Sequence, residues 1–168
     1  SMLNLDELSV LSDVGRNRIA IHEAGHAVCY GLCHGVPEDA YVYVDENMHD
    51  MLAGKVSLPL PRDVADLSRD HLHWALLTTL AGEAAEEAFF GVPSLCSAGD
   101  MIQFNQLAPG FLAAGYGEVY LFQPETEQDG TLNRAVIERL REKYRQLARE
   151  FVLLNRSSIE KIAGILQT

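Results

Sequence analysis

The first clear pattern of apolar and polar positions predicts a helix from Ser12 or Asp13 to about Cys33. Ser12 and Asp13 are residue types that cap helix starts, and Gly35 stands just past the expected end. Successive side chains of a helix are rotated by about 100°, so the spacing shows which residues share a face. One face carries both histidines and two thiols together with larger side chains: Ile19, His22, His26, Cys29, Tyr30 and Cys33.

Two short segments after this helix have the composition of β-strands. Residues 41–44 read Tyr-Val-Tyr-Val, which are residue types that favour strands, and residues 55–58 alternate between polar and apolar. Ten polar or mixed residues separate the segments, and Pro59 and Pro61 follow the second one. We expect the two segments to form two strands of a small sheet.

Helical spacing dominates the rest of the chain. A long helix is expected over residues 68–90, and a third helix is expected from about residue 98 until Pro109 breaks it. A fourth helix is expected over residues 131–154. After it, Ser157–Glu160 has the spacing of a capping box, which predicts a last short helix.

These elements predict one mainly α-helical domain with a small β-sheet, an α+β fold, over residues 1–168. A chain of 168 residues is long enough to bury its own core. Residues 1–12 are expected to be an N-terminal leader, in which Ser1 before Met2 resembles the scar of an expression tag. Met2 and the leader favour a complete short protein, and residues 131–168 are expected to form a C-terminal helical hairpin.

The charge of the chain narrows the range of partners. There are 24 acidic and 13 basic residues, which gives a formal net charge of −11. Nucleic acids and anionic membrane surfaces are bound mainly through Lys and Arg, so neither is expected as a partner. Most of the carboxylates are expected to lie on a solvated surface, and a few are candidates to bind a cation.

Cysteine content and hydropathy together predict a cytoplasmic protein. The three cysteines are Cys29, Cys33 and Cys96, and an odd number this small does not form a disulfide framework, which favours a reducing compartment. The chain has no apolar run of the roughly 18–20 residues that a membrane span needs, and its start does not have the pattern of a signal peptide.

The most specific chemical signal is the segment His22-Glu23-Ala24-Gly25-His26, which matches H-E-x-x-H on a predicted helix. Residues four apart share a helix face, so both imidazoles can bind one metal ion. Zinc suits such nitrogen ligands, and catalytic zinc sites keep a position open for water. Glu23 lies beside the histidines and is the candidate general base for that water.

A catalytic zinc site needs a third protein ligand, and the spacing leaves two possibilities open. A metzincin site would place a ligand six residues after His26, with a glycine midway, but those positions are Leu32 and Cys29. One remaining candidate is the acidic group on the long helix, Glu83, Glu86 and Glu87. The other candidate is Asp100, at the start of the next helix.

Several segments together resemble the peptidase domain of the FtsH-type ATP-dependent zinc proteases. Residues 19–27 are similar to the zinc-binding helix of that family. Residues 80–87 are similar to its glycine-alanine-glutamate run, and the glycine that follows this run in the family corresponds to Gly91. The resemblance covers roughly residues 16–167. It implies a zincin-like helical fold, a Zn²⁺ cofactor and Asp100 as the third ligand, because the family has its ligand aspartate at that place.

The chain departs from the family pattern near the expected third ligand. The family's threonine-threonine-glycine-alanine stretch reads Ser94-Leu95-Cys96-Ser97, its alanine-threonine pair is replaced by Phe104-Asn105, and an arginine of the helix motif is Glu83. The family also carries membrane helices and an ATPase, whereas this chain contains no G-x-x-x-x-G-K-[ST] phosphate loop. We therefore expect peptides or unfolded proteins as substrates, with a possible ATPase partner in trans. The resemblance also implies a possible homo-oligomer, a hexamer.

The function predicted from these observations is that of a zinc metalloendopeptidase without its own ATPase. His22, His26 and Asp100 are expected to hold the zinc, and Glu23 is expected to act as the general base. The alternative is a zinc-containing module that binds peptides or docks on an ATPase without catalysing turnover. A third possibility is a hydrolase that acts on a non-peptide amide.

Overall fold

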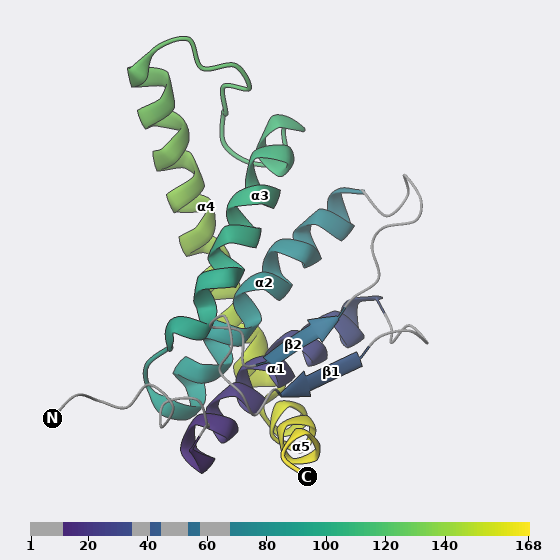
Figure 1. Ribbon diagram of the computed structural model, residues 1–168. Helices are drawn as coiled ribbons and strands as arrows, with labels where there is room; N and C mark the ends of the chain where they lie inside the picture. The colour runs from purple at the N-terminus through teal and green to yellow at the C-terminus, as the bar shows by residue number, and fades with distance from the viewer. Residues whose placement is uncertain (1–11, 35–40, 45–53, 58–67) are drawn as a thin grey trace, which may run out of the picture.

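The computed structural model describes residues 12–34, 41–44, 54–57 and 68–168 (Figure 1). Residues 1–11 of the expected leader, together with Gly35, Pro59 and Pro61, lie outside the described residues. In chain order the elements are α1 (Asp13–His34), β1 (Tyr41–Val44), β2 (Gly54–Ser57), α2 (Arg69–Phe90), the 3-10 turn η3 (Leu95–Ser97), α3 (Ala98–Ala113), α4 (Glu127–Leu154) and α5 (Arg156–Leu166).

The expected bounds of α1 and α2 are confirmed, because both helices begin at the capping residues in the sequence. The Ser12 hydroxyl accepts a hydrogen bond from the Gly15 amide at 3.1 Å, and the Ser68 hydroxyl accepts one from the His71 amide at 3.2 Å. The end of α2 is set by Gly91, whose φ of 83° is a left-handed conformation that glycine adopts without strain.

Helices α1 and α2 pack against each other more extensively than any other pair of described elements. Small residues permit this close approach. A Cβ atom added at Gly25 would lie 2.6 Å from the carbonyl oxygen of Ala81 and 2.9 Å from the Cβ of Ala85. The contact is therefore tight enough that only glycine fits at position 25.

The α+β class expected from the sequence is corrected, because the described fold is helical. In the described part of the chain, β1 and β2 pair only with each other, antiparallel, with Tyr41 opposite Ser57 and Val44 opposite Gly54. Two strands of four residues each cannot form a layer on which helices pack. The apolar surface is instead buried between helices, and the β1–β2 ribbon lies beside α1.

The prediction that α3 breaks at Pro109 is wrong. The helix continues through Pro109 to Ala113. Proline inside a helix costs about 3 kcal/mol, but buried side chains on both sides of it, Phe104 before and Phe111 after, anchor this helix in the core. The burial of these two aromatic side chains outweighs the local cost.

The start of α4 and the cap of α5 also differ from expectation. α4 begins at Glu127 rather than residue 131, because Thr126 and Asp129 form a capping box through bonds of 3.1 and 2.9 Å. The capping box expected at Ser157–Glu160 is absent from the structure, which describes this whole segment. Instead α5 follows α4 directly at Asn155, whose carbonyl accepts the first amide bonds of α5.

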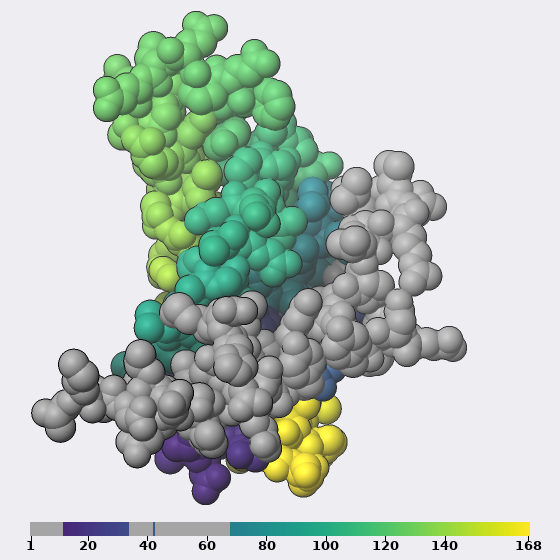
Figure 2. Space-filling view, viewed as in Figure 1, coloured from purple at the N-terminus to yellow at the C-terminus, as the bar shows by residue number. Residues whose placement is uncertain are grey.

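The other helices pack around the α1–α2 pair. α5 packs mainly on α1, and α3 and α4 both pack on α2. The end of α3, the start of α4 and the loop between them project away from α1 and α5 (Figures 1 and 2). Among the described residues, no helix combines the length and the apolar character needed to cross a bilayer.

Candidate metal centre

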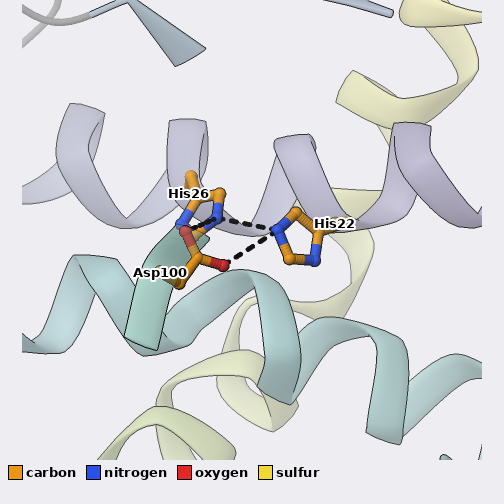
Figure 3. A group of neighbouring side chains, drawn as sticks. All are labelled: His22, His26 and Asp100. Atoms are coloured by element: carbon orange, nitrogen blue, oxygen red, sulfur yellow. Dashed lines mark hydrogen bonds and ion pairs between the residues drawn. The ribbon is translucent and has the colours of Figure 1, made fainter. Parts of the chain in front are cut away.

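Three side chains from two helices converge on one point, as Figure 3 shows. His22 and His26 come from α1, and Asp100 comes from the first turn of α3. The Nε2 atoms of the histidines are 3.1 Å apart. The carboxylate of Asp100 lies 3.1 Å from His22 Nε2 through Oδ2 and 3.3 Å from His26 Nε2 through Oδ1.

The tautomers of the two histidines follow from what their other ring nitrogens contact. His26 Nδ1 lies 2.7 Å from the carbonyl oxygen of Thr78, which can only accept a hydrogen bond, so Nδ1 carries the proton. His22 Nδ1 donates in the same way to Glu86 Oε1 at 2.8 Å. In the neutral rings both Nε2 atoms therefore hold lone pairs, and these point at each other and at a carboxylate.

A cluster of lone pairs this close requires a cation, and its geometry fits zinc. Ligand atoms bound to tetrahedral zinc at about 2.0–2.2 Å are roughly 3.3–3.6 Å apart, close to the 3.1–3.3 Å observed here. Asp100 Oδ2 is buried and makes no hydrogen bond of good geometry. Two imidazoles and one carboxylate suit zinc better than Ca²⁺ or Mg²⁺, which prefer oxygen ligands.

Gly82 of α2 forms the floor of this cluster. A Cβ atom at Gly82 would lie 2.5 Å from His26 Nε2 and 2.7 Å from His22 Nε2. Neither ring can turn aside without breaking its Nδ1 hydrogen bond. The absence of a side chain at position 82 therefore keeps the ligand atoms in place.

The electrostatics also show that the cluster attracts positive charge. Burial lowers the pKa of His22, but the interactions of its ring with the carboxylates of Asp100 and Glu86 outweigh burial and raise the pKa to about 10. Burial lowers the pKa of His26 too, but the charge and contact of Asp100 together with the charge of Glu23 outweigh burial and raise it. Burial raises the pKa of Asp100, yet the two histidines together hold it below its usual range. Without a metal ion, the site therefore favours the protonated form of His22 at neutral pH.

The structure separates the two candidates for the third ligand. Asp100 faces both imidazoles, whereas Glu86 lies behind His22, on the side of the ring away from the cluster. Glu83 lies 3.3 Å from Arg145, and Glu87 lies 2.8 Å from Arg149, both of them on α4. Within the described residues, the group that could hold a metal ion is His22, His26 and Asp100.

Glu23 is buried in α1 next to His22, with 6% of its surface exposed. Its charge contributes to raising the pKa of both histidines, so it is electrostatically part of the site. It does not belong to the group of converging donor atoms. This position, close to the cluster but outside it, is compatible with the role of a base rather than a ligand.

Four residues that hold the site were not identified from the sequence. Thr78 acts through its backbone carbonyl, which has no sequence signal, and Gly82 acts through having no side chain. Ser94 and Arg18 bind Glu86, at 3.0 Å each. Arg18 is one helical turn before His22, and this spacing is a signal that could have found it.

Comparison with known proteins gives one partial relation. No family model matches the chain. The ATP-dependent zinc metalloprotease FTSH 6, chloroplastic, of Oryza sativa subsp. japonica is 32% identical over 119 residues, which are 68% of this chain and 17% of that protein. The chain thus spans about a sixth of the length of this relative. The match supports a distant relation to FtsH-type zinc metalloproteases.

Proposed function

We propose that this chain is a zinc-dependent peptidase that hydrolyses peptide bonds in peptides and unfolded proteins. The observation that carries the proposal is the convergence of His22, His26 and Asp100, with both histidine lone pairs aimed at one point by Glu86 and Thr78. The distant relation to a zinc metalloprotease supports the same chemistry.

Each residue has a definite task in this proposal. His22, His26 and Asp100 hold the zinc. Bound zinc would supply a Lewis acid and lower the pKa of a water molecule to about 7. The Glu23 carboxylate accepts a proton from the attacking water and returns it to the nitrogen of the leaving amine. Glu86 and Thr78 keep the two imidazoles in the required tautomer throughout.

The proposal extends to partners. The relative is named as ATP-dependent, and this chain matches 17% of it. We propose that an ATPase partner in trans delivers unfolded segments to the site, and that copies of this chain associate as a homo-oligomer. Without such a motor the substrates are segments that are already unfolded.

The test compares wild type with Glu23→Gln on casein, an unstructured substrate, and measures bound zinc in parallel. General-base catalysis typically contributes 10²- to 10⁴-fold, so Glu23→Gln is expected to retain zinc and lose at least about 100-fold in cleavage rate. Glu142→Gln is the matched control, because it removes the same charge from an exposed position on α4. Zinc bound in both proteins with cleavage in neither would overturn the peptidase proposal and favour a zinc-containing peptide-binding module.

A further inference from the structure

Arg18 joins α1 to α2 and to the connection that leads from α2 to α3. It belongs to α1, four residues before His22. Its Nη1 donates to Glu86 Oε2 on α2 at 3.0 Å and to the carbonyl oxygen of Val92 at 2.8 Å. Val92 lies in the connection between α2 and α3, which leads to Asp100. One guanidinium group therefore links the helix of the histidines, the helix of the buried glutamate and the connection that leads to the helix of the aspartate.

The other partners of Glu86 show why this link matters. The Glu86 side chain is completely buried, and its Oε1 accepts bonds from His22 Nδ1 at 2.8 Å and from the Ser94 hydroxyl at 3.0 Å. A buried carboxylate is stable only when charge and hydrogen bonds compensate for lost hydration. Arg18 supplies the positive charge on Oε2, and this leaves Oε1 free to orient the imidazole of His22.

The guanidinium of Arg18 is itself held in place. It lies over the ring of Phe90, 4.6 Å from the ring centre, and 25% of the side chain is exposed. A planar group fixed by a ring face and two acceptors loses little further freedom when it orients its neighbour. Lysine would keep the charge and lose the stacked planar group.

We propose that Arg18 is a positioning residue of the metal centre, which acts through Glu86 on the orientation of His22 and through Val92 on the placement of Asp100. This inference rests on the proposed zinc function. Arg18 does not contact the metal or the substrate in this proposal. Removing it weakens zinc binding because His22 and Asp100 lose their fixed relative position.

The test measures zinc affinity by competition with a coloured chelator for wild type, Arg18→Met, Arg18→Lys and Arg149→Met. Removing a group that orients a metal ligand typically costs 10- to 100-fold in affinity, and Arg18 acts one contact further out, so Arg18→Met is expected to bind zinc roughly tenfold more weakly. Arg18→Lys is expected to recover most of the loss. Arg149→Met is the matched control, because Arg149 pairs with Glu87, the neighbour of Glu86, on the side of α2 that faces α4.

A second readout separates positioning from a general loss of stability. Co²⁺ bound in place of zinc has a visible spectrum that depends on ligand geometry, and Arg18→Met is expected to change the shape of this spectrum while Arg149→Met leaves it as in wild type. Ser94→Ala removes an uncharged donor from Glu86 while His22 and Arg18 still bind this carboxylate, and it is expected to weaken zinc binding by about threefold. If Arg18→Met fails to fold, Ser94→Ala tests in its place whether the partners of Glu86 control zinc binding.

The outcomes distinguish this inference from the proposed function. Zinc affinity within twofold of wild type in Arg18→Met, or in Ser94→Ala if Arg18→Met does not fold, overturns the positioning role. Weakened zinc binding in Arg18→Met supports it even where wild type cleaves no casein, and in that case only the peptidase proposal fails. A wild-type protein that binds no zinc overturns both.

Discussion

The two sides of α2 carry neighbouring glutamates in contrasting surroundings. Glu86 faces α1, is completely buried and binds His22, Ser94 and Arg18. Glu87, the next residue, faces α4, and its ion pair with Arg149 is exposed, with 38% of the Glu87 side chain and 44% of the Arg149 side chain open to solvent. The same residue type therefore orients a candidate metal ligand on one side and forms a surface ion pair on the other.

The difference follows from solvation. An exposed ion pair is worth about 0–1 kcal/mol because water and salt screen both charges. Removing one partner from a buried pair costs about 3–5 kcal/mol, because the other charge stays buried without compensation. The buried face of α2 should therefore control both stability and the site, and the exposed face should control neither.

Replacing each of the two glutamates in turn is the strongest test of the difference between the two faces of α2. Glu86→Ala leaves the Arg18 guanidinium without its carboxylate partner and the Nδ1–H of His22 without its acceptor, so we expect the free energy of unfolding to fall by about 3–5 kcal/mol. Glu87→Ala is expected to change it by less than about 1 kcal/mol. Urea unfolding of both variants measures the difference, and equal losses would show that burial does not separate the two faces.

The next effect concerns Gly82, on the buried face. Gly82→Ala places a methyl group where the Nε2 atoms of His22 and His26 lie, so we expect zinc affinity to fall by about 100-fold, the upper end for a change that displaces ligand atoms. Gly164→Ala in α5 is the control, because nothing lies within 4 Å of the added Cβ. It is expected to leave zinc affinity unchanged and to stabilise the fold by about 0.4–1 kcal/mol. Zinc titration of Gly82→Ala that matches wild type would contradict the predicted overlap.

The pH dependence of zinc binding tests the electrostatics of the buried face. The raised pKa of His22 means that its proton stabilises the metal-free fold fully below about pH 6.5, and that this stabilisation is lost as the pH rises through about 10. Zinc must displace that proton, so apparent zinc affinity is expected to rise about tenfold per pH unit between pH 7 and 9 for each proton displaced. Calorimetry in two buffers of different ionisation heat counts the protons released. No proton release at pH 7.5 would contradict the raised pKa.

The smallest effect is expected on the exposed face. Exchanging the charges of the surface pair, in the double variant Glu87→Arg with Arg149→Glu, keeps an ion pair of opposite polarity between α2 and α4. We expect zinc affinity within twofold of wild type and a free energy of unfolding within about 0.5 kcal/mol. A larger change in either quantity would mean that this face is coupled to the site.

The elements that could be predicted from the sequence are those set by local signals. The caps at Ser12 and Ser68 and the left-handed Gly91 mark the ends of α1 and α2, and the four-residue spacing of His22 and His26 places both rings on one face. The capping box at Thr126 is also a local signal, and it places the start of α4 before the expected residue 131.

The features that escaped prediction depend on contacts between distant segments. Helix α3 continues past Pro109 because the core holds the side chains around it, which no local pattern shows. Spacing alone left Asp100 and the glutamates of α2 as alternatives, because the choice depends on how α2 and α3 pack against α1. The roles of Thr78, Gly82 and Arg18 are likewise properties of the packed helices.

Metal analysis of wild type and Asp100→Ala tests the proposed zinc site most directly. With His22 and His26 as the other ligands, we expect one zinc per chain in the wild-type protein and a loss of most of it in Asp100→Ala after dialysis against a weak chelator. Asp129→Ala, which removes a carboxylate from the cap of α4, is the control and is expected to keep its zinc. Undiminished zinc in Asp100→Ala would contradict the assignment and point back to the glutamates of α2.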